Sequence, residues 1–343
     1  MRAGIVAGLL MLLASGAACA ADVCPLLRSQ QSAPNVATRI AAIACNENLL
    51  WYRPFIDSNG RMADATVAEG ESSRLSDGSE AWRRVAGYWT GSGLLGRMSG
   101  YAGASDCGYA GNQRFSSPPC RAFVIDNPWS AAFVSWVMTR AGVPGFQPSA
   151  SHFDYVREAR LHAAASPFRF LDPATTPPAP GDLLCYVRAA SRAYGYAGLA
   201  AAIDGGSGAL NMHCDIVVAA NPGNDGKAWL VGGNVQQGVT LRLLNVNRSG
   251  VLWALPRRLE GEVDCSPDTP AACNFSRQDW AVLLKLKPLA ELALLGPTTP
   301  PPMGLASPLP QQACCVNCVL GAQPPVPRCP VQKPESGAVS PGG

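Results

Sequence analysis

Residues 126–142 constrain the fold most, because they carry the signals of a helix that is buried almost from its first turn. Asp126 and Asn127 can cap such a helix, and Pro128 suits its first position, where the missing N–H costs nothing. Apolar residues then recur at helical spacing, and Gly142 follows them as a C-terminal cap. The stretch therefore predicts a core helix that begins at Pro128 and ends before Gly142.

Ser130 falls in the first turn of this expected helix. Free backbone N–H groups and the helix dipole favour negative charge there, which suits a nucleophile and its oxyanion hole. The plainer interpretation is that Ser130 is a small residue at the start of a core helix. Trp129 beside it either packs in the core or forms the floor of a groove that binds substrate.

Helix signals come early in the chain and strand signals come late. Beyond the central helix, helical patterns occupy residues 34–51, 80–89 and about 151–164, with Ser149 or Ser151 as the cap of the last. Strand patterns occupy residues 182–188, 213–219, 227–231, 239–246 and 280–286. This order predicts an α+β fold in which N-terminal helices pack on an antiparallel sheet. Two Gly-rich segments, 90–119 and 189–212, are expected as a loop and a flap.

The N-terminus is typical of an exported protein. Arg2 leads into an apolar run and then small residues that end at Ala20, which predicts a signal peptide over residues 1–20. Acylation of Cys19 in a lipoprotein is the alternative, but Gly16 stands where such signals carry Leu. The expected location is the periplasm or the exterior, without a membrane span. A net charge of +3 and no long basic run give no indication of nucleic-acid binding.

The chain contains 13 cysteines, and removal of the signal peptide leaves an even number, as expected for disulfides in an oxidising compartment. Three short-range pairs are expected: Cys24 with Cys45, Cys107 with Cys120, and Cys265 with Cys273. A cluster at Cys314, Cys315, Cys318 and Cys329 could form a stapled segment within the tail. The predicted organisation is one domain over residues 21–287 and a Pro- and Cys-rich, largely disordered tail over residues 288–343.

Polar residues at strand ends are the second set of candidates. His213 opens a strand and shares a face with Asp215, whereas Cys214 points to the other face and is expected in the core or in a disulfide. Asp215 shares the His213 face, but such neighbours are usually too far apart for good contact. Asn234 follows Gly232 and Gly233 at a strand end and could orient His213, although it also suits an ordinary turn.

Two further candidates have plainer alternatives. His152 lies at the start of the helix after the central one, where it either caps that helix or lines a cleft and contacts substrate. Glu69 and Glu71 are expected in a surface loop. A metal site from His152, His213 and Asp215 is conceivable, but the spacing matches no metal-binding signature, so no metal or cofactor is expected.

Four motifs follow one another along the chain, and their order and spacing carry a resemblance: PWSAAFVSW at residues 128–136, PGDL at 180–183, HCDIVV at 213–218 and GGNV at 232–235. Together they resemble the CHAP branch of the NlpC-type, papain-like cell-wall hydrolases, and in particular an exported bacterial family of that superfamily. In CHAP enzymes a cysteine stands where this chain has Ser130. The resemblance spans about residues 40–286.

The resemblance implies a papain-like fold and an exported hydrolase of amide or peptide bonds in peptidoglycan. In that hypothesis Ser130 attacks, His213 acts as general base and acid, and Asn234 orients His213, while Trp129, His152 and Asp215 contact substrate. A serine hydroxyl is a far weaker acid than a thiol and depends fully on its histidine. The alternative is therefore a catalytically inactive module that binds peptidoglycan or a peptide, and a metal-dependent hydrolase is a third class.

Overall fold

The computed structural model describes residues 22–296, apart from residues 71–72, 113, 189–192, 259–260, 262 and 264. The expected signal peptide, Glu71, and the cysteine cluster of the tail lie outside the described residues. Within the described part the chain has an α+β fold, as the order of its helical and strand patterns predicts.

The described part contains eight α-helices and eight strands. The helices are α1 (Cys24–Leu27), α2 (Val36–Leu50), α3 (Ala81–Gly91), α4 (Pro118–Asp126), α5 (Ser130–Ala141), α6 (His152–Leu161), α7 (Gly195–Asp204) and α8 (Leu289–Leu292). The strands are β1 (Phe55–Ile56), β2 (Met62–Ala63), β3 (Phe168–Leu171), β4 (Leu183–Val187), β5 (Met212–Ala220), β6 (Lys227–Val235), β7 (Gly238–Asn245) and β8 (Asp279–Leu286). All four predicted helices and all five predicted strands are present.

The strands form one sheet in the order β2-β1-β7-β6-β5-β4-β8-β3. The five predicted strands pair antiparallel with one another, in agreement with the sequence. The sheet as a whole is mixed, because the two-residue strand β1 runs parallel to β7. A wholly antiparallel sheet was therefore the wrong expectation, since β1 is too short to carry an alternating pattern that sequence analysis can detect.

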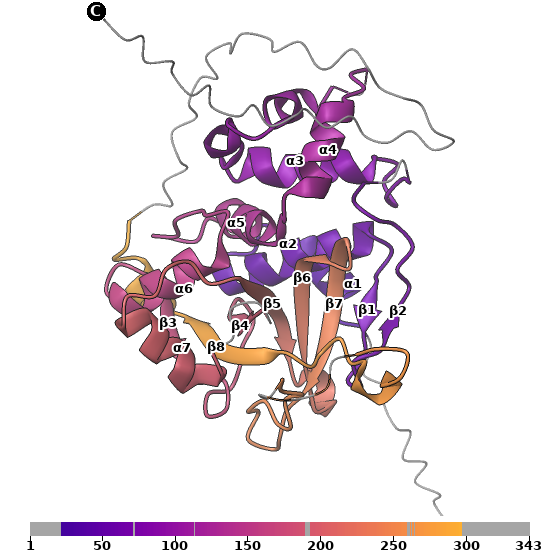
Figure 1. Cartoon of the computed structure of the whole chain (residues 1–343). Coiled ribbons are helices and arrows are strands. Elements are labelled where there is room, and N and C mark those ends of the chain that lie inside the picture. The colour runs from indigo at the N-terminus through magenta and orange to yellow at the C-terminus, as the bar shows by residue number, and fades with distance from the viewer. Residues whose placement is uncertain are drawn as a thin grey trace, which may run out of the picture.

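Two layers of helices cover one face of the sheet. Figure 1 shows α2 and α5 next to the sheet, with α3 and α4 beyond them, and α6 and α7 toward the β3–β8 edge. A second, smaller hydrophobic cluster covers the opposite face and includes Tyr186, Val217 and Trp280. The central strands are consequently buried on both faces, and all five residues of β4 are buried.

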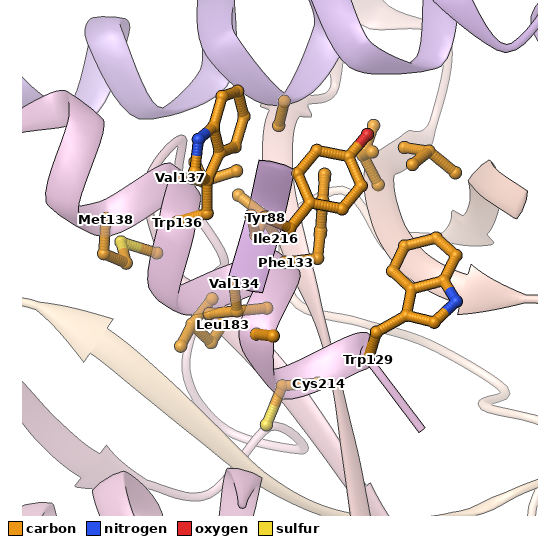
Figure 2. Close-up of a cluster of buried hydrophobic side chains, with 14 of the residues drawn as sticks. Tyr88, Trp129, Phe133, Val134, Trp136, Val137, Met138, Leu183, Cys214 and Ile216 are labelled. Atoms are coloured by element: carbon orange, nitrogen blue, oxygen red, sulfur yellow. The ribbon is translucent and has the colours of Figure 1, made fainter. Parts of the chain in front are cut away.

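The central helix α5 is buried nearly all round. Figure 2 shows its side chains in one cluster with Tyr88 of α3 and with Leu183, Cys214 and Ile216 of the sheet. Gly142 ends α5 in the left-handed conformation (φ 66°), as predicted. Both glycines at the end of β6 permit close approach, because a Cβ on Gly233 would lie 2.5 Å from Phe133.

The start of α5 differs from the prediction. Asp126 ends α4 and Trp129 is the N-cap of α5, so Asp126, Asn127 and Pro128 do not begin the central helix. The earlier helix α4 begins at Pro118, where the Ser117 hydroxyl accepts a hydrogen bond from the backbone N of Cys120 (3.1 Å). This cap was the missed signal, because a Ser-Pro pair is a strong helix start. The expected flap likewise contains a helix, α7.

All eight cysteines of the described part form disulfides. The three predicted pairs, Cys24–Cys45, Cys107–Cys120 and Cys265–Cys273, are confirmed. The fourth pair, Cys185–Cys214, joins directly opposed residues of β4 and β5 and confirms that Cys214 belongs to the core. Four disulfides are typical of proteins that fold in an oxidising compartment. Among the described residues, no helix is both long and apolar enough to cross a membrane.

Candidate functional site

The start of α5 is tied to the sheet by two polar side chains from distant segments. Asn234, at the end of β6, donates to Glu69 Oε2 and accepts from the backbone N of Trp129, both at 3.1 Å, in the amide orientation that satisfies both groups. The indole Nε1 of Trp129 donates to the same Glu69 oxygen (2.9 Å). Glu69 is buried, so the expectation of a surface loop there was wrong. Its loop lacks regular structure, and no sequence pattern marked it as internal.

Trp129 belongs to the core. Its side chain is fully buried and stacks on Trp51, with ring centroids 5.8 Å apart. Trp51 Nε1 in turn donates to the Tyr88 hydroxyl (3.1 Å), which donates to the buried carboxylate of Glu47 (2.7 Å). This packing sets the direction in which the next residue, Ser130, enters its helix.

Ser130 contacts a histidine, and that histidine is His152. His152 Nε2 lies 2.8 Å from Ser130 Oγ, and His152 Nδ1 shares a hydrogen bond with the Tyr155 hydroxyl. The contact arises because α5 and α6 both begin at this point, with Ser130 and His152 as their first residues. Tyr155 follows His152 by one helical turn, so the two side chains lie on the same face of α6. The three-residue spacing of His152 and Tyr155 could have identified this histidine–tyrosine pair from the sequence.

His213 is adjacent to His152 but forms its hydrogen bonds with other residues. The two imidazole centroids are 5.2 Å apart. His213 Nε2 donates to Asp215 Oδ1 (2.8 Å), and its Nδ1 accepts from Arg188 Nη2 (3.5 Å). Both ring nitrogens are therefore occupied in the neutral tautomer that carries hydrogen on Nε2. We expected His213 beside Ser130 and Asn234 beside His213, but the hydrogen bonds of these residues lead elsewhere.

Asp215 lies closer to His213 than the strand geometry suggested. Its carboxylate bridges His213 and Arg242, whose Nε donates to Asp215 Oδ2 (2.9 Å). Gly232 makes room for this contact, because a Cβ there would lie 1.9 Å from Asp215 Oδ1. Arg242 also donates to the carbonyl oxygen of Phe275 (2.8 Å). No local sequence signal pointed to Arg242, which is on a strand two positions away in the sheet.

Burial controls the charge states in this region. Burial, followed by the proximity of His213 and Arg188, holds the pKa of His152 well below its usual range. Burial also lowers the pKa of His213, against the attraction of Asp215. For Asp215, burial opposes ionisation, but Arg242 and His213 outweigh it and keep the pKa of the carboxyl well below its usual range. At neutral pH both histidines are consequently neutral and Asp215 is ionised.

The pKa of Tyr155 is raised well above its usual range, first by burial and then by Asp154, so its phenol stays protonated at neutral pH. Burial also raises the pKa of Glu69, although the hydrogen bond from Trp129 opposes this shift. Among the described residues, no group of three His, Cys, Asp or Glu side chains has the arrangement of a metal site.

A pocket of about 390 Å³ opens beside Asn234. Tyr186 and Arg188 at the end of β4 line it, together with Arg242. Asn234 lines this pocket and also accepts a hydrogen bond from the backbone N of Trp129, so the pocket is close to the start of α5. Ser130 itself is 4% exposed and is not part of the pocket lining.

Comparison with known proteins identifies a bacterial family. A family model described as "uncharacterized protein conserved in bacteria (DUF2272)" matches residues 76–286, well over half of the 343-residue chain. No curated protein and no solved structure matches the chain. The matched segment includes Ser130, His152, His213 and Asn234, and it begins after Glu69. The chain that carries this buried serine–histidine contact therefore belongs to the DUF2272 family of bacterial proteins.

Proposed function

We propose that this protein is an exported hydrolase of amide or peptide bonds in which Ser130 is the nucleophile and His152 its general base. The observation that carries the proposal is the 2.8 Å contact between Ser130 Oγ and His152 Nε2 at the start of α5. The histidine differs from the one that sequence analysis favoured, because His213 is occupied by Asp215 and Arg188. Ser130 keeps its expected role.

Acyl transfer by this pair follows from the positions of its atoms. The Ser130 hydroxyl proton passes to His152 Nε2 as Oγ attacks the carbonyl carbon, and the carbonyl oxygen becomes an oxyanion. His152 then gives the proton to the leaving amine, and water hydrolyses the ester in a second cycle. For Nε2 to accept, Nδ1 must carry hydrogen and donate to the Tyr155 oxygen. No side chain of the described residues caps α5, so its first-turn N–H groups remain available to stabilise the oxyanion.

This arrangement predicts slow turnover. Burial lowers the pKa of His152, which makes it a weak base, and its Nδ1 partner is a phenol instead of a carboxylate. A phenol stabilises an imidazolium less than an ionised carboxylate does. The charge of Asp215 raises the pKa of His152 through space, since the hydrogen bonds of Asp215 go to His213 and Arg242.

Peptidoglycan is the substrate that we propose. The four motifs resemble those of CHAP-type cell-wall enzymes, the family is bacterial, and the four disulfides suit an extracytoplasmic protein. The papain-like classification of the fold belongs to the same proposal. It is compatible with a helix that begins at Ser130 and packs on β5 and β6.

Labelling with a fluorophosphonate tests the nucleophile without knowledge of the substrate. The mature chain should gain one adduct on the peptide that contains Ser130, as measured by intact mass and peptide mass spectrometry. Ser130→Ala and His152→Ala should abolish this adduct, and Tyr155→Phe should slow its formation. Ser135→Ala is the matched control, because Ser135 is buried in the same helix and its hydroxyl bonds to the Ser149 backbone, away from His152. Equal labelling of the wild type and His152→Ala would refute the assigned base.

Digestion of purified peptidoglycan tests the substrate. Soluble fragments from the wild type but not from Ser130→Ala would identify the bond that is cleaved. Ser130→Cys replaces the hydroxyl by the thiol found in CHAP enzymes and should raise turnover, because a thiol ionises more readily. Adduct formation on Ser130 without any fragment would overturn peptidoglycan as the substrate and leave the hydrolase assignment in place.

A second candidate function is a binding module without turnover. The observation that favours it is the burial of Ser130 and its separation from the pocket lining. This alternative predicts no fluorophosphonate adduct on Ser130, together with binding of peptidoglycan that survives Ser130→Ala. Restored cleavage in Ser130→Cys would then show that the site retains the form of an enzyme.

A further inference from the structure

The pocket beside Asn234 has a positive character that the hydrolase proposal does not use. Among the described residues, its polar lining consists of Tyr186, Arg188, Asn234, Gln236, Arg242 and Gln278, and no acidic side chain of that part lines it. Ile56 and Phe275 add apolar surface. Such a combination of a few convergent polar groups with apolar walls is typical of small-ligand sites.

The two arginines of the pocket differ in burial and in whether a carboxylate balances their charge. Arg242 is buried, and its guanidinium donates to Asp215, to the Phe275 carbonyl oxygen and to the Ser276 hydroxyl. Its charge is thus balanced within the protein. Arg188 is exposed, and its guanidinium hydrogen-bonds to His213 (3.5 Å), whose ring is neutral at pH 7. Arg188 therefore contributes a positive charge that no carboxylate of the pocket lining balances.

The charges behind the pocket leave this excess in place. Asp215 is the carboxylate in contact with Arg242, and the two charges cancel. Glu69 bonds to Asn234 and to the Trp129 indole and is not part of the lining. Of the two arginines that line the pocket, Asp215 balances Arg242 alone, so Arg188 remains a positive charge next to several amide groups, a setting that favours a single anion.

We propose that this pocket binds a carboxylate group of the substrate, with Arg188 as its charged partner and Gln236 and Gln278 as amide donors. The assignment rests on the proposed function in one respect, since it makes the carboxylate part of the molecule that Ser130 would cleave. The link is Asn234, which lines the pocket and accepts a hydrogen bond from Trp129, the residue before Ser130. A substrate held by its carboxylate would therefore place a neighbouring amide bond toward the start of α5.

Binding is measured by isothermal titration calorimetry on the mature Ser130→Ala variant, so that turnover plays no part. Two matched pairs of probes separate the sources of the carboxylate. The first pair is N-acetyl-trialanine with a free C-terminal carboxylate and the same peptide as its C-terminal amide. The second pair is N-acetyl-Ala-Glu-Ala amide and N-acetyl-Ala-Gln-Ala amide. We expect at least one acidic probe to bind about tenfold more tightly than its neutral partner, as for one charge-assisted hydrogen bond.

Three further substitutions in the Ser130→Ala background identify the pocket. Arg188→Gln should remove the preference for the acidic probe. Gln236→Glu should reverse the preference, because glutamate has the size of glutamine and adds a negative charge at this exposed position. Arg169→Gln is the control, because Arg169 is half-exposed on β3 and pairs with Glu291 away from this pocket.

The proposal is overturned if neither acidic probe binds with a dissociation constant below about 10 mM, or if acidic and neutral probes bind equally. It is also overturned if the preference for the acidic probe survives both pocket substitutions. These outcomes are independent of the hydrolase assignment. Adduct formation on Ser130 combined with no acidic preference would leave the nucleophile in place and reject the carboxylate pocket. Acidic preference without adduct formation would leave a binding protein with the same ligand chemistry.

Discussion

Replacement of Asn234 by alanine should weaken the junction between β6 and α5 and lower the free energy of unfolding. The substitution removes the acceptor of the Trp129 backbone N–H, worth about 1 kcal/mol, and one donor to the Glu69 carboxyl, worth about 1–2 kcal/mol. It also leaves alanine at a φ of 56°, which asparagine tolerates and alanine does not, at about 1 kcal/mol. Because neighbouring effects do not add fully, we expect a total loss of about 2–4 kcal/mol.

Asn234→Gly separates the two causes, since glycine removes both hydrogen bonds but adopts the left-handed conformation without strain. We expect the glycine variant to be more stable than the alanine variant by about 1 kcal/mol. Urea unfolding, followed by circular dichroism with the disulfides intact, measures all three proteins. An alanine variant within about 0.5 kcal/mol of the wild type would refute the hydrogen bonds between Asn234, Glu69 and Trp129.

Three further predictions concern pH, packing and helix capping. Burial lowers the pKa of His152 and His213, so the unfolded chain takes up protons first as pH falls below about 6.5. The free energy of unfolding should then fall by about 1.4 kcal/mol per pH unit for each histidine. His152→Asn should flatten this slope between pH 6.5 and 5, whereas His162→Gln, at an exposed position, should leave the slope unchanged. Gly233→Ala should cost about 1–3 kcal/mol in urea unfolding, because its Cβ would collide with an aromatic ring of α5; an unchanged midpoint would contradict this packing. Asp279 accepts three backbone N–H groups around the start of α7, so Asp279→Ala should lower amide hydrogen-exchange protection of α7 more than that of α5; equal changes in both helices would argue against the cap.

Sequence analysis located elements well where the pattern was long and local. The apolar spacing of α5 and the alternation along β5 predicted both elements, and the alternation also placed His213 and Cys214 on opposite faces. The Cys185–Cys214 disulfide was not predicted, because it depends on the register of two strands separated by a helix. Register between distant strands is set by the completed sheet and not by either segment alone.

The candidate site was only partly accessible to sequence analysis for the same reason. Ser130 was identified from its position at a helix start, which is local information. Its partnership with His152 depends on where α6 crosses the start of α5, and no periodicity within either helix encodes that crossing. The contact of Asp215 with Arg242 spans three strands and depends on Gly232 to admit the carboxylate. Long-range contacts of this kind require the folded structure.

The disulfides have a consequence for how the chain matures. Each of the four joins cysteines that are consecutive within the described part, with sequence separations of 21, 13, 29 and 8 residues, and none of the loops interleaves with another. If the chain crosses a membrane N-terminus first, every bond can close as soon as its second cysteine emerges. Oxidation in order of emergence then yields these native pairings, so maturation of this part requires an oxidant but little shuffling of mispaired intermediates.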